Sequence, residues 1–292
     1  MTRPVAAIAD SRSHYDGVAK ALELIEDQIS QGIKGKNKVL VKPNFVTTSR
    51  QLAATHVDAV KAILDTIRKY YSETVIIGEG PAFSSFRSGL ENYNYLKLRS
   101  EYDVEFVDLN EDDYVEVEAF DSRLNPMNLR ISKTVVESDY RISAALAKTH
   151  DFVIVTLAIK NMVVGSLVGG EKWRLHQGYK AMNMNIARLA KTIMPHLGVV
   201  DGYLGMEGRG PSSGDPIQSR FATASVYPVS LDAVTSKIMG FEPFDIVYLY
   251  HSNNWKVGVA DLRMIDTVGR SIADVARRFR PHPRCRDMLS WR

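Results

Sequence analysis

Short apolar runs rich in β-branched residues alternate with segments of helical periodicity along most of this 292-residue chain. The strand-like runs of the first third are Val5–Ala9, Lys38–Lys42, Thr74–Gly78 and Val104–Leu109. The helical patterns between them are Tyr15–Gln31, a segment from Thr55 as N-cap to Tyr70, and one from Ser84 or Ser85 to about Arg99. Such alternation predicts an α/β fold with a mainly parallel sheet and helices on both of its faces.

The middle of the chain departs from this alternation. Residues 112–132 hold two β-like runs around a turn-rich segment, which predicts an inserted β-hairpin. Residues 151–163 are apolar throughout and fit either a strand or a buried helix. Later elements are a short helix near 133–138, strands at 140–145 and 221–226, and helices at 181–194 and 229–239.

We expect residues 1–276 to form a single large α/β domain, with two lobes of about 1–110 and 133–276 as an alternative division. Residues 277–292 form a basic tail with six arginines and one aspartate. Without the tail the chain has 31 basic and 33 acidic residues, so the body is not a basic platform for nucleic acid. We expect a loosely held, solvated tail, and a docking segment is the alternative.

Cys285 is the only cysteine, which excludes an intrachain disulfide, a zinc ribbon and an iron–sulfur cluster held by cysteines of this chain. No apolar run is long enough to span a bilayer, and the N-terminus lacks the pattern of a signal peptide. These features predict a cytoplasmic protein without a membrane partner.

Polar side chains follow several of the expected strands directly. Lys42 and Asn44 follow one strand, Glu79 follows the next, and Asp201 ends a later strand at 199–201. In parallel sheets, ligands bind beyond the carboxyl ends of the strands, so these side chains are expected at one rim. His56 stands at the start of a helix, where free amides and a histidine can meet an anion, although a plain helix cap explains it as well.

A second group of polar residues flanks the apolar segment 151–163. It consists of Lys148, His150, Lys160, Asn161, Lys172 and His176. Lysines at buried or rim positions are costly unless an anion meets them, so the group predicts a carboxylate or phosphate site. If the segment were one helix, His150 and Lys160 would lie ~15 Å apart and contact opposite ends of a long ligand.

The stretch 201–216, DGYLGMEGRGPSSGDP, holds five glycines and predicts a long loop that opens at Asp201. It matches neither a Walker A loop nor a dinucleotide fingerprint. Its glycines would let backbone amides approach an anion, and a surface loop is the alternative. The expected cradle residues are Gly208, Gly210, Ser212, Ser213 and Gly214.

These motifs together resemble the DUF362 family of bacterial and archaeal proteins. The matching stretches run in order through VLVKPN (39–44), ATH (54–56), IIGEGP (76–81), VDLN (107–110), AKTH (147–150), TLAIKNMVVG (156–165), the histidine at 176, 199–216 and 228–240. The resemblance adds weight to Asp232 as a further residue of the shared site. Family members are often fused to a ferredoxin-like module with cysteine-ligated clusters, which this sequence does not contain, so a separate ferredoxin is an alternative partner.

The sequence therefore predicts an enzyme-like cleft for an anionic small molecule. We expect catalytic roles for Lys148, His150, Lys160, Asp201 and Glu207. The expected ligand-binding residues are Lys42, Asn44, His56, Asn161, Lys172 and His176, with the glycine-rich loop. A divalent metal, if used, would take Glu79, Asp201 and Glu207. The alternatives are a redox protein that works with an external ferredoxin and a scaffold protein that uses the basic tail.

Overall fold

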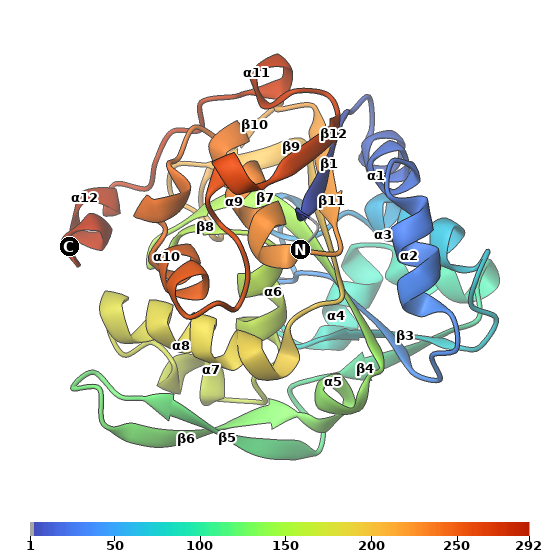
Figure 1. Cartoon of the computed structure of the whole chain (residues 1–292). Coiled ribbons are helices and arrows are strands. Elements are labelled where there is room, and N and C mark those ends of the chain that lie inside the picture. The colour runs from blue at the N-terminus through green and yellow to red at the C-terminus, as the bar shows by residue number, and fades with distance from the viewer. Residues whose placement is uncertain (1–2, 292) are drawn as a thin grey trace.

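The computed structural model describes residues 3–291, and one ten-stranded sheet runs through it (Figure 1). The order across the sheet is β12-β1-β11-β9-β7-β2-β3-β4, with β8 paired to β7 and β10 paired to β9. The strands are β1 (Val5–Asp10), β2 (Val39–Lys42), β3 (Val75–Glu79), β4 (Val104–Asp108), β7 (Tyr140–His150), β8 (Ile154–Thr156), β9 (Leu197–Glu207), β10 (Asp215–Ile217), β11 (Phe221–Ser225) and β12 (Asp266–Gly269). Every strand on the main path except β11 runs in the same direction, as expected for a mainly parallel sheet.

Helices cover both faces of the sheet (Figure 1). They are α1 (His14–Glu23), α2 (Glu26–Ile33), α3 (Val57–Ile67), α4 (Phe86–Asn92), α5 (Lys133–Glu137), α6 (Ala158–Gly165), α7 (Glu171–Arg174), α8 (Tyr179–Ile193), α9 (Pro228–Ile238), α10 (Val247–Asn254), α11 (Ile272–Val275) and α12 (Cys285–Leu289). Short 3₁₀ turns are η1 (Gln51–Ala53), η2 (Tyr95–Ser100), η3 (Pro243–Asp245) and η4 (Leu262–Met264).

The sheet separates two hydrophobic cores because successive residues of a strand point to opposite faces. In β2, Leu40 packs into the core beneath α6, α8, α9 and α10, whereas Val39 and Val41 pack into the core beneath α1, α2 and α3. Strands that are buried on both faces have continuous apolar sequences, which explains why β1 and β2 could be predicted from the sequence.

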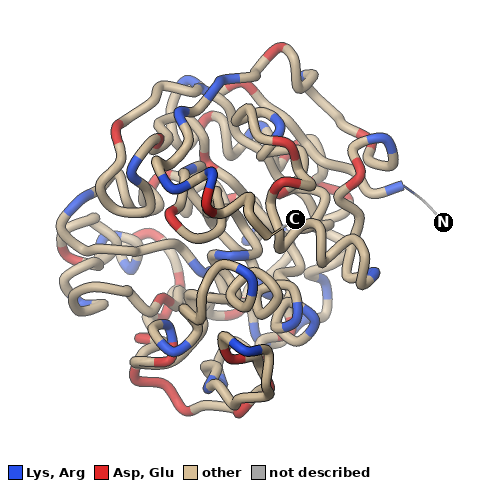
Figure 2. Tube along the Cα trace, turned by 90° about the vertical axis from the view of Figure 1, so that its left-hand side faces the viewer, with Lys and Arg blue, Asp and Glu red and all other residues tan. Residues whose placement is uncertain are grey.

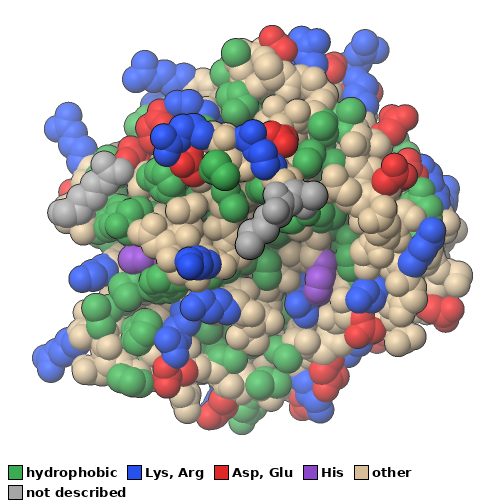
Figure 3. Space-filling model, viewed as in Figure 1, with side chains coloured by type: hydrophobic (Ala, Val, Ile, Leu, Met, Phe, Trp, Pro, Cys, Tyr) green, Lys and Arg blue, Asp and Glu red, His purple; other side chains and the backbone are tan. Residues whose placement is uncertain are grey.

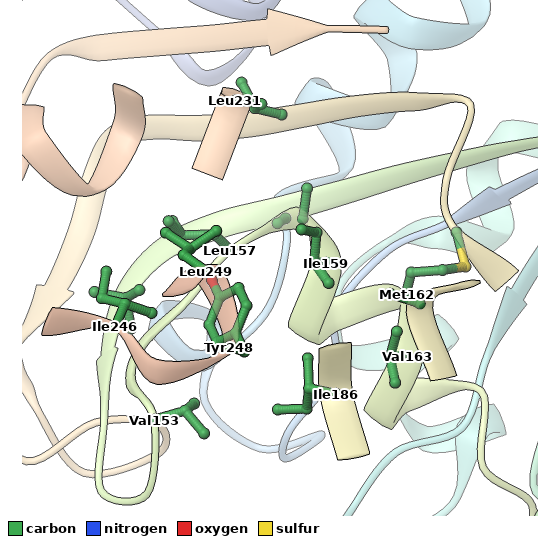
Figure 4. Close-up of a cluster of buried hydrophobic side chains, with 14 of the residues drawn as sticks. Val153, Leu157, Ile159, Met162, Val163, Ile186, Leu231, Ile246, Tyr248 and Leu249 are labelled. Carbon is green, nitrogen blue, oxygen red and sulfur yellow. The ribbon is translucent and has the colours of Figure 1, made fainter. Parts of the chain in front are cut away.

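Helix α6 is fixed in the first of these cores (Figure 4). Ile159, Met162 and Val163 of α6 are fully buried with Ile186 of α8 and Tyr248 of α10. The polar residues Lys160 and Asn161 of the same helix therefore occupy positions set by dense packing around them.

The hairpin expected near 112–132 is confirmed. It consists of β5 (Tyr114–Phe120) and β6 (Pro126–Ser132), which form a separate two-stranded sheet. Asn185 of α8 holds its end, because its side-chain amide donates to the carbonyl of Phe120 and accepts from the amide of Phe120, both at 2.8 Å.

Three expected helices differ in extent. The pattern over Tyr15–Gln31 forms two helices, α1 and α2, and the pattern that begins at Ser85 ends at α4 and continues as η2. The cap of α3 is His56 rather than Thr55: the His56 Nδ1 accepts from the amide of Asp58 at 3.2 Å. Thr55 is buried, and its hydroxyl donates to the carbonyl of Ala144 at 2.7 Å.

Residues 151–163 are neither one strand nor one helix. The chain turns after β7, returns as the short strand β8, and then enters α6. The geometry of a single helix between His150 and Lys160 therefore does not apply.

The long loop expected to open at Asp201 is also wrong, because β9 continues to Glu207 and only 208–214 form the turn before β10. The strand needs glycine where neighbours approach closely. A Cβ at Gly202 would lie 2.5 Å from the ring of Phe221, and one at Gly205 would lie 2.8 Å from the carbonyl oxygen of Ala147. Close packing, which favours glycine as much as ligand binding does, accounts for these residues.

The basic tail is packed rather than loose. Phe279 and Met288 are each 1% exposed and belong to the core that also holds α9 and α10. Arg280 pairs with Asp215, and its amide donates to the Glu207 carboxylate at 2.9 Å. The prediction of a solvated tail was wrong because the apolar side chains among the arginines are buried in the core.

Lys and Arg are distributed over the trace together with Asp and Glu, and the face in Figure 3 shows both signs interspersed (Figures 2 and 3). Within residues 3–291 no helix has the length and apolar character needed to cross a membrane.

Asp232 of α9 caps α6 from a neighbouring helix. Its carboxylate accepts from the amides of Ala158 and Ile159 at 2.9 and 3.1 Å and from the hydroxyl of Tyr248 at 3.0 Å. Asp232 thus positions α6, the helix that carries Lys160 and Asn161, through the amides at its start. Burial raises the pKa of this carboxyl to about 7.

We expect Asp232→Ala to lower the free energy of unfolding by about 2–4 kcal/mol, because two buried helix amides and a buried hydroxyl lose their acceptor. Urea unfolding of the variant against Asp27→Ala, a change at an exposed position of α2, measures the effect. A loss no greater than that of the control would contradict the capping role.

Candidate functional site

The carboxyl ends of the parallel strands bring the predicted rim residues together. Lys42 ends β2, Glu79 ends β3 and Lys148 lies near the end of β7. Asp201 lies on β9, opposite Leu146 of β7. The parallel register thus brings side chains more than 100 positions apart in the chain to one edge of the sheet.

Lys42 and Glu79 form a buried ion pair at the centre of this edge. Both side chains are at most 2% exposed, and a second Glu79 oxygen accepts from the amide of Phe45 at 3.2 Å. Burial lowers the pKa of Lys42 and raises that of Glu79, while their mutual attraction opposes both shifts. Gly165 of α6 makes room for the ammonium group, because a Cβ there would collide with the Lys42 Nζ.

Asn161 links this pair to its neighbours. Its Oδ1 accepts from the Lys42 Nζ and the Asn44 Nδ2, both at 3.1 Å. Its Nδ2 donates to the Lys42 carbonyl at 3.1 Å and to the Ser143 hydroxyl at 3.0 Å. All four hydrogen-bonding positions of the amide are used, so its orientation is fixed.

Lys148 extends the same network. Its ammonium donates to Asn44 Oδ1 and to the carbonyl of Ala53 at 2.9 Å, and the side chain is fully buried. Burial holds the pKa of Lys148 well below its ordinary value, and the nearby charge of Lys160 lowers it further.

Lys160 differs from the other two lysines because it forms no hydrogen bond or ion pair within residues 3–291, although it is only 7% exposed. Burial lowers its pKa to about 8, against the attraction of Asp151. A nearly buried ammonium group without an acceptor is costly, because it has lost its hydration and gained no hydrogen bond in exchange.

Two histidines flank these lysines in opposite tautomers. The His150 Nδ1 accepts from the amide of Phe152 at 3.0 Å, and burial with Lys160 nearby keeps its pKa well below 6.5, so the proton of the neutral ring is on Nε2. The His176 Nδ1 lies 2.6 Å from the carbonyl of Lys172, which only accepts, so its Nε2 carries the lone pair. One ring therefore offers a donor and the other an acceptor.

Lys172 also belongs to this edge. Its ammonium donates to Asn110 Oδ1 at 2.6 Å and to the carbonyl of Leu167, and burial lowers its pKa to about 8. Gly80 leaves room for it, because a Cβ there would be 2.9 Å from the Lys172 Nζ.

A histidine–carboxylate pair lies at the same rim, and sequence reasoning missed half of it. The His14 Nδ1 is 2.5 Å from Asp201 Oδ2, and the other Asp201 oxygen accepts from the amide of Tyr203 at 3.0 Å. The ring of His14 stacks on that of His56 with centroids 4.1 Å apart. His14 follows β1, another parallel strand, so the rule that located Lys42 and Glu79 would also have located it.

In the turn 208–214, the amides of Gly208, Gly210 and Ser213 are not free for an anion, because each donates to a carbonyl of the protein. The Gly208 amide donates to the carbonyl of Arg280, and the Gly210 amide donates to that of Gly208. Arg50 holds the turn from outside, because its guanidinium donates to the carbonyls of Ser212 and Gly214 at 2.8 and 2.6 Å. The Ser212 and Ser213 hydroxyls contact each other at 3.4 Å. The turn packs on Thr149, next to the end of β7.

The expected metal set of Glu79, Asp201 and Glu207 does not come together. Glu79 pairs with Lys42, Asp201 with His14, and Glu207 with Arg280 at 3.7 Å. Within residues 3–291 no three His, Cys, Asp or Glu side chains form a group that could hold a metal ion. Glu207 is accordingly a partner of the C-terminal segment rather than of the lysines.

A family model described as a domain of unknown function, DUF362, matches residues 39–237. The chain belongs to the DUF362 family. The match covers β2 to α9 and so includes every residue of the lysine network, whereas His14 precedes it.

A curated relative is the thylakoid-associated protein sll1697 of Synechocystis sp., which is 29% identical over 221 residues, or 73% of this chain and 66% of that protein. Among solved structures, the lactate racemase apoprotein from Thermoanaerobacterium thermosaccharolyticum is similar with a TM-score of 0.51 and 14% identity. That likeness covers 80% of this chain and 57% of the racemase chain and shows a shared fold. The DUF362 chain thus spans about two thirds or less of the length of both proteins.

We expect Glu79→Gln to lower the free energy of unfolding by about 3–5 kcal/mol, because it leaves the Lys42 ammonium buried without its counter-ion. The double variant Lys42→Met/Glu79→Leu should recover most of that loss, since it removes both charges. Denaturant unfolding of the three proteins tests this, and a double variant no more stable than Glu79→Gln would contradict the ion-pair interpretation.

Proposed function

We propose that this DUF362 protein is an enzyme that binds a small carboxylate or phosphate anion at the carboxyl rim of its sheet. The observation that carries the proposal is Lys160, a nearly buried ammonium without an acceptor beside Lys148 and His150. An anion would supply the missing acceptor.

The charge balance of the rim supports this proposal. The rim holds the buried lysines Lys42, Lys148, Lys160 and Lys172 and two buried carboxylates, Glu79, which pairs with Lys42, and Asp201, which pairs with His14. Asp108 and Asp151 attract Lys172 and Lys160 but remain partly exposed at the edge. A bound anion would reduce the repulsion among these ammonium groups and strengthen the site in its low-dielectric surroundings.

Acid–base chemistry is the reaction class that the flanking groups support. In the His14–Asp201 pair the carboxylate accepts from Nδ1, which leaves Nε2 as a base held in one orientation. The His150 Nε2–H would donate to the anion, and the His176 Nε2 would accept from a substrate hydroxyl. We infer a proton transfer on an anionic substrate, with Lys160 and Lys148 as its binding groups.

The structural relative adds a substrate class to test. Its name gives lactate, a 2-hydroxy carboxylate, as the substrate of that racemase. A molecule of this class carries both an anion for Lys160 and a hydroxyl for a histidine. The separate ferredoxin and the cytoplasmic location expected from the sequence stay predictions.

We expect Lys160→Met to weaken binding of L-lactate by about 30-fold, because a buried charge-assisted contact is lost. Isothermal titration of the whole chain measures the effect, with Lys97→Met as the control because Lys97 is exposed and has no ion pair among the described residues. Binding that is equal in both variants, for L-lactate and for inorganic phosphate alike, would rule out the lysine site.

We expect His14→Gln to retain lactate binding but to reduce exchange of the lactate C2 hydrogen with D2O at least tenfold, because the base is removed. Proton NMR follows the exchange, and His251→Gln on α10 serves as the control. Exchange that is unchanged in His14→Gln would contradict the assigned base.

The affinity for the anion should fall as the pH rises through about 8. Lys160 is cationic below its pKa of about 8 and neutral above it, whereas an ordinary lysine would remain charged to 10.5. Titrations between pH 6 and 10 test this, and an affinity that stays constant to pH 10 would show that Lys160 does not bind the anion.

A further inference from the structure

A cavity of about 900 Å³ lies at the amino ends of the parallel strands, across the sheet from the carboxyl ends that carry the lysine network. Its wall includes Pro4 just before β1, Tyr140 at the start of β7 and His196 just before β9. A cavity of this volume accommodates a small organic ligand.

This cavity is separate from the lysine network. Tyr140 and Lys148 are eight residues apart on β7, which corresponds to about 26 Å along an extended strand. No residue of the lysine network or of the His14–Asp201 pair lines the cavity.

The charged residues of the cavity wall are all basic. Lys34, Lys36, Arg141 and Lys191 line it together with His196, and no aspartate or glutamate does so. None of the four cations pairs with a carboxylate within residues 3–291. Asp139, which attracts Arg141 and His196, lies outside the wall, and its carboxylate accepts from the amides of Asn37 and Lys38 at 3.0 and 3.1 Å.

Arg141 and His196 are held in place by the backbone. The Arg141 guanidinium donates to the carbonyls of Ser138 and Met194 at 2.9 and 3.1 Å. The His196 Nδ1 accepts from the Arg141 amide at 2.9 Å, and burial lowers its pKa to about 4. The neutral ring therefore carries its proton on Nε2, which has no partner among the described residues and is a donor for a ligand.

The remaining wall is apolar and aromatic. The Tyr140 ring stacks on His196 with centroids 5.4 Å apart. Apolar lining residues are Val226, Pro228, Val229, Val257 and Val259. Two buried polar atoms of wall residues, the Tyr140 hydroxyl and the Gln28 Oε1, lack a hydrogen-bond partner, which is uncommon unless a ligand or water satisfies them.

We propose that this cavity binds a second small molecule, one with a phosphate or carboxylate group on an aromatic or apolar body. The anionic group meets Lys34, Lys36 and the His196 Nε2–H, and the body lies against Tyr140 and the valines. Neither the DUF362 family description nor the proposed function at the other rim assigns a ligand here.

Isothermal titration with phenyl phosphate and with benzoate at low salt tests the proposal. The whole chain carries Lys160→Met throughout, so that the other rim does not contribute. We expect binding of at least one probe, weakened about five- to tenfold by Lys34→Gln/Lys36→Gln, since each lysine contributes about 0.5–0.7 kcal/mol. Thr192→Trp, which fills the cavity from the exposed side of α8, should abolish binding.

Lys97→Gln is the charge-matched control, and benzyl alcohol is the neutral control ligand. The proposal is overturned if neither probe binds, if the cavity variants bind as well as Lys97→Gln, or if benzyl alcohol binds as tightly as phenyl phosphate. If inorganic phosphate binds as tightly as phenyl phosphate, the proposed contact of the ligand body with Tyr140 and the valines is wrong. Each of these results leaves the test of Lys160 with lactate unaffected.

Discussion

Buried positive charge is the constraint around which this edge of the protein is organised. Lys42, Lys148 and Lys160 lie in the interior, where an ammonium group loses its hydration. Glu79 neutralises the first, and Asn44 with a backbone carbonyl satisfies the second. The third has no acceptor among residues 3–291. The arrangement is costly for folding alone, and such cost is typical of a site that serves a ligand.

The position of Lys160 is set by residues that form no hydrogen bond with its ammonium group. Asp232 fixes the start of α6, and apolar side chains on two sides fix its rotation. Asn161 then sets the relation between the helix and the end of β2, because its four hydrogen bonds leave it no alternative orientation. Family resemblance across 39–237 thus includes structural residues as well as contact residues, and a motif alone does not separate the two.

Much of the sheet was predictable because β2, β3 and β7 are buried on both faces and read as apolar runs between amphipathic helices. Since parallel strands share one carboxyl edge, Lys42, Glu79 and Lys148 followed from the same rule. The glycines of β9 were misassigned because a small residue permits close packing and ligand approach alike. His14 follows β1 and was within reach of the same rule, whereas the packed tail was missed because the core around α9 that it joins is distant in sequence.

The depth of the lysine site has a consequence for the timing of ligand exchange. Lys148, Lys160 and His150 are each less than a tenth exposed, so the ligand proposed for this site would reach them only after neighbouring residues move. Association would then be slower than diffusion allows, and its rate would follow the opening of the rim rather than ligand concentration at saturation. Dissociation of the ligand would be limited by the same opening. A ligand acquired in the cell would therefore remain bound during purification steps that remove weakly held molecules.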